Sequence, residues 1–146
     1  MAASEHFCLG FSVARITLRM DRSQNMAAIR SKDTVPEMRV RRLVHSMGYR
    51  YRLHLSDLPG KPDLVFPGRG KIIFVHGCFW HQHGCKESHL PKSNEAYWAS
   101  KLQRNRVRDA EHLNALRLAG WKCLILWECE LTIDAVLRQR LSRFLG

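Results

Sequence analysis

The chain has 146 residues, of which 45% are hydrophobic and 25% charged, so it is long enough for one domain with a packed core. Twenty-four Lys and Arg against thirteen Asp and Glu give a net charge of +11, which favours a polyanionic partner over a merely solvated basic surface. No apolar run approaches the roughly 18 residues of a membrane span, which disfavours a membrane partner. Five cysteines, three of them near histidines, suit metal ligation in a reducing compartment better than a disulfide scaffold. We expect a cytoplasmic, nucleoid-associated protein, and we expect it to be a monomer.

The N-terminal segment divides into two parts. Residues 1–19 match nothing around them in hydrophobic period or charge, so we expect either a disordered extension or a start codon assigned too early, with Met20 as the natural start. A single domain is then expected over residues 20–146. The segment from Asp21 to Arg30 is typical of a short basic helix. Its apolar face carries Met26 and Ile29.

A longer helix is predicted next, because Thr34 and Glu37 have the spacing of a capping box with a proline in the first turn. Four apolar residues then recur at helical spacing before Gly48, which ends the helix. They are Val40, Leu43, Val44 and Met47. The stretch from Tyr49 to Leu53 fits an edge strand.

A β-hairpin is predicted in the middle of the chain. Asp63 opens a short strand that ends at Phe66, and residues 67–70 are rich in the Gly and Pro of a turn. The apolar, β-branched run from Lys71 to Val75 then has the length of a buried strand. We expect these two strands to pair antiparallel.

The second half of the chain predicts a helix, a strand and a helix. Ser93 or Asn94 can cap a long helix that runs to Ala119, and the run from Trp121 to Trp127 is apolar enough for a buried strand. The last amphipathic helix uses Ile133, Val136, Leu137, Leu141 and Phe144. This order of elements predicts an α/β fold in which helices flank a mixed central β-sheet.

Residues 76–85 follow the hairpin and combine three histidines, two cysteines and an aromatic pair. Three cysteines and one histidine can supply the four N and S ligands of a structural Zn²⁺ site. They are Cys78, His83, Cys85 and Cys129. Spacing alone does not choose His83 over His76 or His81, and unligated thiols beside a hydrogen-bonded histidine are the alternative.

Asp63 and the groups that follow the next strand resemble the arrangement of PD-(D/E)xK nucleases. In that superfamily an aspartate and a second acid hold Mg²⁺, while a lysine orients the attacking water. Here the acid-x-lysine slot holds Phe74, Val75 and His76, so the second carboxylate is replaced and a histidine stands for the lysine. Without this resemblance, Asp63 reads equally well as a capping or turn aspartate.

Three motifs in this order make a closer resemblance. They are LPGKPD at residues 58–63, HGCFWHQHGC at 76–85 and WEC at 127–129. With them the chain resembles the very-short-patch repair (Vsr) endonucleases from about Asp21 to Glu130. Such enzymes have a restriction-endonuclease-like fold and nick one DNA strand beside the thymine of a T:G mismatch left by deamination of 5-methylcytosine.

The resemblance implies roles for individual residues. A catalytic Mg²⁺ would bind Asp63 and the main-chain carbonyl of Val75, a position where the family has a threonine. His81 would activate the attacking water, Glu37 would orient His81, and His76 would contact the scissile phosphate. A structural Zn²⁺ would leave His81 free, because its implied ligands are Cys78, His83, Cys85 and Cys129.

The resemblance also implies DNA contacts. An aromatic wedge that enters the base stack at the mismatch would consist of Phe79, Trp80 and Trp98, although core packing is an alternative for Trp98. The N-terminal helix would approach the other groove with Met26 and Ile29, and basic residues would contact phosphates. These are Arg22, Arg30 and Lys32. One face of the long helix suits base or backbone contacts, or simply faces solvent; it carries Lys101, Asn105 and Asp109.

The implied partner is double-stranded DNA with a T:G mismatch, and a functional link to a DNA cytosine methyltransferase and to mismatch-repair proteins is left open. Two other hypotheses remain. One is a zinc-stapled DNA-binding module without catalysis, because the second acid is absent. The other is a PD-(D/E)xK-type nuclease that acts on unmismatched DNA.

Overall fold

The structure is a computed structural model, and it describes residues 32–146. The expectations for residues 1–19 and for the helix at 21–30 lie outside this range. The same holds for four predicted DNA contacts, which are Arg22, Met26, Ile29 and Arg30. Among the described residues, no helix is long and apolar enough to cross a membrane.

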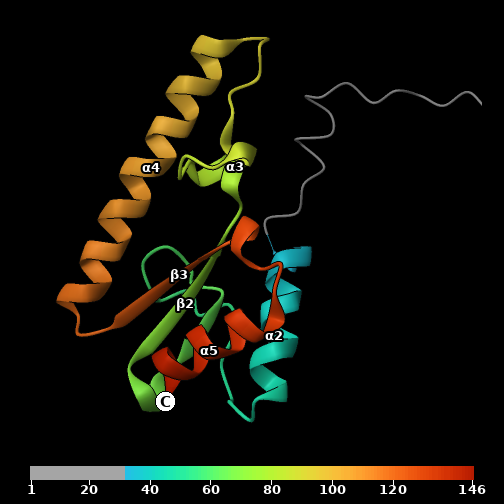
Figure 1. Cartoon of the computed structure of the whole chain (residues 1–146). Coiled ribbons are helices and arrows are strands. Elements are labelled where there is room, and N and C mark those ends of the chain that lie inside the picture. Colours follow the sequence, from blue (N-terminus) through green and yellow to red (C-terminus); the bar gives the residue numbers. More distant parts are fainter. Residues whose placement is uncertain (1–31) are drawn as a thin grey trace, which may run out of the picture. The chain divides into compact units, whose positions relative to one another are not determined.

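A three-stranded mixed sheet forms the centre of residues 32–146, in the order β1–β2–β3 (Figure 1). Strand β1 (Leu64–Phe66) pairs antiparallel with β2 (Lys71–His76), and a 3-10 turn at Pro67–Arg69 joins them. Strand β3 (Lys122–Trp127) pairs parallel with β2 from Lys71 to His76. The predicted hairpin and the predicted mixed sheet are therefore confirmed.

Side chains alternate between the two faces of each strand, so the sheet has two apolar faces. One face packs against α2 (Val35–Ser46) and α5 (Asp134–Leu145), and the other packs against the C-terminal half of α4 (Glu95–Leu118) (Figure 1). The first core includes Val40, Val44, Leu64, Phe66, Ile73, Leu126, Leu137 and Leu141. The second core includes Val65, Ile72, Phe74 and Leu116. The α/β sandwich holds the ends of β2 and β3 in fixed positions.

The helix ends follow the predicted signals. The Thr34 hydroxyl accepts a hydrogen bond from the Glu37 N–H at 3.4 Å, and the Glu37 carboxylate accepts one from the Thr34 N–H at 3.4 Å. Gly48 follows the helix with φ +88°, a left-handed conformation that glycine adopts without strain. Asn94 occupies the N-cap position of α4, although its side chain makes no capping hydrogen bond, and Gly120 comes two residues after the helix.

Three details of the sequence prediction are wrong. Strand β3 is not a buried strand, because it lies at the edge of the described sheet and only Leu126 among its six residues is fully buried. The stretch from Tyr49 to Leu53 forms only a single bridge, between Arg52 and Val65. His54 then adopts φ +53°, which turns the chain away from β1 before a ladder can form. Ile133, which precedes α5, and Val136 within it are 58% and 55% exposed, so they do not belong to the buried stripe. That stripe instead consists of Leu137, Leu141 and Leu145.

Candidate active site and metal centre

The site lies where β2 and β3 end. His76 is the last residue of β2 and pairs in register with Trp127, the last residue of β3. Helix α3 (Cys78–His81) begins two residues later, so the cysteines, histidines and aromatic residues are delivered directly from the sheet. Helix α3 also packs on α4, which brings a second set of side chains to the same place.

Asp63 lies just before β1, and its carboxylate accepts a hydrogen bond from the Val75 N–H at 2.6 Å. Burial raises the pKa of Asp63 to about 6; the Val75 hydrogen bond opposes this shift, the charge of Glu37 adds to it, and Arg41 opposes it. A desolvated carboxylate close to a second acid ionises more readily when a cation is bound. Asp63 therefore fits a metal ligand close to the C-terminal end of β2.

Two histidines stack on one another at this end of β2. The rings of His76 and His81 are 3.8 Å apart between centroids, with an interplanar angle of 8°. His81 Nδ1 lies 2.5 Å from Asp109 Oδ2, so the carboxylate fixes the orientation of the imidazole. Burial lowers the pKa of His76 to about 4; the charge of His81 adds to this effect and Asp109 opposes it. His76 is therefore neutral near pH 7.

The expected contact between Glu37 and His81 is not formed. Glu37 is 3% exposed, and its carboxylate pairs with Arg41 one turn further along α2. Because α3 lies along α4, the carboxylate within reach of His81 comes from α4 instead. Asp109 was predicted only as one of three polar residues on a helix face, and its spacing from Lys101 and Asn105 was the available signal. Its pairing with His81 depends on the packing of α3 on α4.

Hydrogen bonding and neighbouring charges also set the pKa of Asp109. Burial alone would raise the pKa of Asp109, but the hydrogen bond with His81 and the positive charges of His81, His76 and Arg108 hold it below its ordinary value. The carboxylate therefore stays ionised. An ionised carboxylate on Nδ1 directs the other nitrogen of His81 away from α4 and stabilises a positive charge on the ring.

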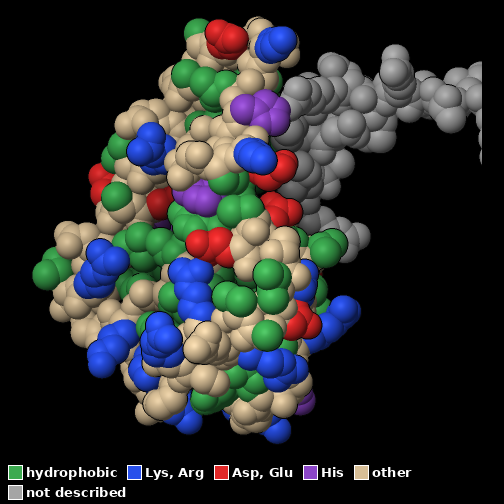
Figure 2. All heavy atoms as spheres, in the orientation of Figure 1, with side chains coloured by type: hydrophobic (Ala, Val, Ile, Leu, Met, Phe, Trp, Pro, Cys, Tyr) green, Lys and Arg blue, Asp and Glu red, His purple; other side chains and the backbone are tan. Residues whose placement is uncertain are grey.

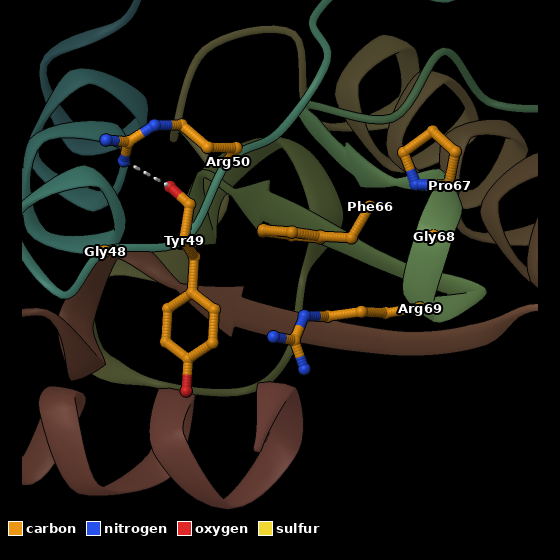
Figure 3. Close-up of a pocket in the computed structure, with 7 residues that line it drawn as sticks. All are labelled: Gly48, Tyr49, Arg50, Phe66, Pro67, Gly68 and Arg69. Atoms are coloured by element: carbon orange, nitrogen blue, oxygen red, sulfur yellow. Dashed lines mark hydrogen bonds between the residues drawn. The ribbon is translucent and has the colours of Figure 1, made fainter.

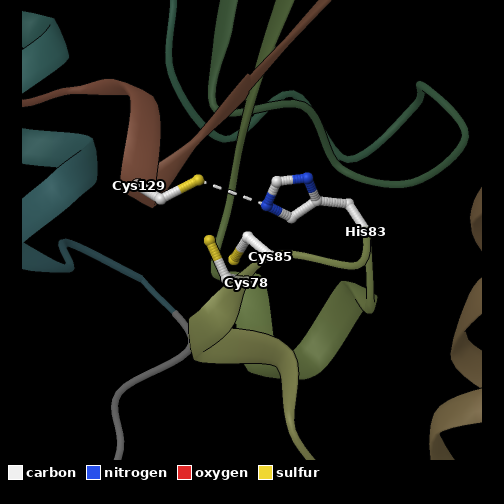
Figure 4. A group of neighbouring side chains, drawn as sticks. All are labelled: Cys78, His83, Cys85 and Cys129. Carbon is white, nitrogen blue, oxygen red and sulfur yellow. Dashed lines mark hydrogen bonds between the residues drawn. The ribbon is translucent and has the colours of Figure 1, made fainter.

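A second cluster combines three thiols and one imidazole (Figure 4). Cys78, His83, Cys85 and Cys129 each place one ligand atom within 4.8 Å of the others, and Cys129 Sγ lies 3.3 Å from His83 Nε2. The imidazole of His83 stacks on Trp127 at 4.1 Å, which fixes its direction. The Ser88 hydroxyl, 3.4 Å from the Cys85 sulfur, is the main cause that lowers the pKa of Cys85 to about 6. Three thiols and an imidazole at these distances fit a tetrahedral N/S metal site.

The predicted aromatic residues gather beside α4. The ring centroids of Phe79 and Trp80 are 5.1 Å apart, those of Phe79 and Trp98 are 5.5 Å apart, and those of Trp80 and Trp98 are 6.1 Å apart. Lys101 Nζ lies 5.4 Å from the Trp98 ring centroid and 5.6 Å from that of Tyr97. Tyr97 was not predicted as part of this aromatic cluster, although it precedes Trp98 in sequence.

The remaining predicted DNA contacts in the described residues have different surroundings. The Asn105 side-chain amide donates to the main-chain carbonyl of Trp80 at 3.3 Å, so Asn105 fixes the backbone of Trp80 against α4. Lys32 is exposed at the start of the described range. Lys and Arg side chains are spread over the face in Figure 2, most densely over its lower half. The basic charge is therefore not confined to the candidate site.

A shallow pocket lies at the other end of the hairpin, around the turn between β1 and β2 (Figure 3). Its volume is about 300 Å³. Its lining residues are Gly48, Tyr49, Arg50, Phe66, Pro67, Gly68 and Arg69. Arg69 lies over the Tyr49 ring at 5.1 Å. This lining from the described part of the chain brings no acid, histidine or cysteine together, so the chemistry lies at the other end of β2.

Comparisons with known proteins agree with the site. Residues 16–87 match the family described as DNA mismatch endonuclease Vsr. The chain is 52% identical over 120 residues to the type II nicking enzyme V.XorIIP of Xanthomonas oryzae pv. oryzae, which covers 82% of this chain and 88% of the relative. It is 37% identical over 129 residues to the DNA mismatch endonuclease Vsr of Escherichia coli, covering 85% of this chain and 83% of the relative.

Fold, site and relatives together define a DNA-nicking endonuclease. The mixed sheet places an aspartate and a histidine pair close to the C-terminal end of its central strand. The chain belongs to the Vsr endonuclease family. The family resemblance predicted from LPGKPD, HGCFWHQHGC and WEC is thereby confirmed.

Proposed function

We propose that this endonuclease nicks one strand of duplex DNA beside the thymine of a T:G mismatch, by Mg²⁺-dependent hydrolysis of the phosphodiester. The observation that carries the proposal is the convergence of Asp63, the His76–His81 pair and the aromatic cluster at the end of β2 and on α3. A hydrolytic group and a base-stacking group then meet the same stretch of DNA. A relative at 37% identity carries the name DNA mismatch endonuclease, which supports the mismatch as substrate.

Asp63 and the main-chain carbonyl of Val75 would hold Mg²⁺. The Val75 N–H points to the Asp63 carboxylate, and the N–H and C=O of one strand residue face the same side. The Val75 carbonyl is then on the side of the carboxylate, and both are hard oxygen donors of the kind that Mg²⁺ prefers. When bound, Mg²⁺ neutralises charge on the phosphate and lowers the pKa of a bound water.

His81 would act as the general base. Asp109 occupies its Nδ1 at 2.5 Å, so Nε2 is the nitrogen that takes the proton from the attacking water. The ionised carboxylate then stabilises the charged imidazole. A general base contributes about 10²–10⁴-fold to the rate of such a reaction.

His76 would contact the scissile phosphate. It is 7% exposed, and its Nδ1 has no hydrogen-bond partner among the described residues. The ring is held by stacking on His81 and by an edge contact with Trp127 at 5.3 Å between centroids. A neutral imidazole in this position donates an N–H to a phosphate oxygen without adding a charge that must be desolvated.

The cysteine-rich cluster would hold a structural Zn²⁺. Its donor set of three thiols and an imidazole is the soft type that Zn²⁺ takes. The ligands lie on α3, on the loop behind it and just after β3. One ion would therefore fix α3 to the end of the sheet and keep His81 in place.

The aromatic cluster would enter the base stack at the mismatch. A mismatched step costs less to unstack than a paired one, which is a source of selectivity in itself. Lys101 lies over the rings of Trp98 and Trp80, where its charge is available to the DNA. Lys32 would contact a phosphate. The other proposed DNA contacts, which are Arg22, Met26, Ile29 and Arg30, lie outside the residues that the structure describes.

A second candidate function is the nicking of fully paired DNA. Two relatives, at 52% and 42% identity, are named type II nicking enzymes, and neither name mentions a mismatch. This candidate uses the same hydrolytic groups. It differs only in what the aromatic cluster recognises.

The decisive experiment compares three duplexes that differ at one base pair, T:G, T:A or C:G, in a panel of flanking sequences. With Mg²⁺, native protein should nick only the T-containing strand of T:G duplexes, and Asp63→Asn should nick none. Equal nicking of the T:A duplex would favour the second candidate. If no duplex is nicked while binding is retained, the chain is a DNA-binding module and the catalytic roles are wrong.

A further inference from the structure

His76, His81 and Asp109 form a second group of metal-ligand side chains. Each offers one ligand atom, and these atoms all lie within 4.8 Å of one another. Two imidazoles and a carboxylate are borderline donors, which suit Zn²⁺, Co²⁺ or Ni²⁺ better than Mg²⁺. The group thus differs in chemical preference from the oxygen donors of Asp63 and Val75, although both lie at the end of β2.

We propose that His76, His81 and Asp109 form an inhibitory binding site for a borderline divalent cation such as Zn²⁺. This site is separate from the cysteine-rich cluster and from the proposed Mg²⁺ ligands. The binding rests only on the geometry of the three side chains. The inhibition rests in addition on the proposed function, in which His81 takes a proton.

The state of His76 points to a ligand. The residue is 93% buried, and Nδ1 is a buried nitrogen without a hydrogen-bond partner among the described residues. A buried nitrogen left without a partner costs free energy, which a bound ion or a phosphate oxygen recovers. Stacking on His81 and the Trp127 edge hold the ring in place.

Asp109 contributes in one of two ways. The carboxylate can leave Nδ1 of His81 and bind the ion directly, or it can stay on Nδ1 and direct Nε2 of His81 to the ion. The second arrangement is the usual support of a metal-bound histidine. The two rings are parallel, so both nitrogens reach one ion only when His76 and His81 turn out of this stacking.

The two metal sites should fill in sequence. Three thiolates and an imidazole bind Zn²⁺ more tightly than two imidazoles and a carboxylate, because zinc favours thiolate donors. The first equivalent therefore enters the cysteine-rich cluster, and the second enters the histidine site. Occupancy of the second site removes the lone pair of His81 and the free nitrogen of His76, so the water and the scissile phosphate both lose their contacts.

The binding is tested by titrating Co²⁺ into the full chain already loaded with one equivalent of Zn²⁺, without Mg²⁺ or DNA. Native protein should bind a second equivalent and develop visible d–d bands without the near-ultraviolet bands of a thiolate–cobalt centre. His76→Gln should abolish this equivalent, and Asp109→Asn should weaken it by about 10–100-fold. His45→Gln, which changes an exposed histidine on α2, should bind Co²⁺ as the native protein does.

Two results would overturn the proposal. One is that native protein binds no cobalt beyond the first metal, and the other is that His76→Gln and Asp109→Asn bind it as tightly as native protein. Far-UV circular dichroism must show that each variant is folded; if His76→Gln is not, Asp109→Asn and His81→Gln decide the outcome. Thiolate–cobalt bands would mean that cobalt entered the cysteine-rich cluster, which also contradicts the assignment.

The inhibition is tested separately. With saturating Mg²⁺ and T:G duplex, Zn²⁺ beyond the first equivalent should stop nicking by native protein, and excess Mg²⁺ should not restore it. Half-inhibition should fall at the zinc concentration that half-fills the second site. If native protein nicks no duplex, the proposed function fails while the cobalt titration still decides the metal site. If nicking occurs and is indifferent to zinc that fills the site, the inhibitory role is wrong.

Discussion

The segment from His76 to Cys85 supplies two neighbouring clusters with opposite chemistry. The cysteine-rich cluster collects soft donors, with Cys129 returning from the end of β3. The histidine cluster collects neutral or basic imidazoles and an ionised carboxylate from α4. His81 stands between Cys78 and His83 in sequence. A metal bound by these neighbours would therefore restrict where its imidazole lies.

The position of the histidine cluster depends on the cysteine-rich cluster, but the reverse does not hold. The cysteine-rich cluster fixes the backbone on both sides of His81. The residues of the histidine cluster, in contrast, have backbones that are already positioned by the sheet, by α3 and by α4. Damage to the first cluster should therefore spread to the second. Damage to the second should leave the first intact, and variants can test this asymmetry.

Cys85→Ser should have the largest effect, because it removes a thiolate from the cluster that orders α3. Structural zinc sites contribute about 10–16 kcal/mol of apparent binding free energy, so we expect loss of zinc, a fall of several kcal/mol in the free energy of unfolding and loss of nicking. Zinc analysis, thermal unfolding and the nicking assay measure the three. Cys123→Ala is the control, since that half-buried cysteine lies outside the cluster and packs with the second core. A Cys85→Ser protein that keeps its zinc would show that Cys85 is not needed as a ligand.

Asp63→Asn should abolish nicking and yet stabilise the fold. In the folded chain the pKa of Asp63 is raised to about 6 from 3.8, so the native state binds the proton more tightly and native stability falls as pH rises through this range. An amide avoids this loss. Without Mg²⁺, the variant should exceed native protein in unfolding free energy by about 1–2 kcal/mol near pH 7.

Denaturant unfolding at about pH 5 and about pH 7 measures this gap, which should widen with pH. Asp134→Asn is the matched control, because Asp134 is exposed and, within residues 32–146, its only ion pair is the surface pair with Arg39. Its unfolding free energy should show no such widening. A native-like nicking rate for Asp63→Asn would remove Asp63 from the proposed metal site.

His81→Gln should lower the nicking rate by about 10²–10⁴-fold, the usual worth of a general base, while zinc content and stability stay native. Asp109→Asn should cost less, at least about tenfold, because the imidazole remains but loses the carboxylate that orients it and stabilises its charge. The loss should be in kcat rather than in the affinity for DNA. Single-turnover kinetics and zinc analysis on the same samples decide the point. If either variant loses zinc, the cysteine-rich cluster depends on the histidine cluster, contrary to the prediction.

Much of this site could be predicted from the sequence because the groups lie within a few residues of one another. The thiol and imidazole ligands surround one turn of helix, and Cys129 directly follows the strand that pairs with β2. Local patterns also predict the capping box at Thr34 and the hairpin headed by Asp63. In each case the residues that cooperate are close in sequence or joined by strand register.

The partner of His81 could not be predicted in the same way. Glu37 and Asp109 are both acids on helices, and sequence gives no distance from either to His81. Glu37 is taken by Arg41, which lies one turn away and is buried with it, while the packing of α3 on α4 brings Asp109 within 2.5 Å. The exposure of Ile133 and Val136 has a similar origin, because the contact of α5 with α2 selects which side of the helix is covered.

Trp98→Leu should act on recognition of the mismatch alone and leave the chemical step unchanged. Base–aromatic stacking is worth about 1–3 kcal/mol per base, so affinity for a T:G duplex should fall by about 5–150-fold. Leucine keeps an apolar contact with Phe79 and Trp80, whose rings meet Trp98, so zinc content and folding should be unchanged. Affinity for the fully paired duplex should change little, because a paired step resists insertion.

Trp121→Leu, which changes a tryptophan that packs against the second core, should bind T:G duplex as native protein does. Equal losses on mismatched and paired duplexes would mean that Trp98 supports binding in general, and recognition of the mismatch would then have to come from other residues than the aromatic cluster.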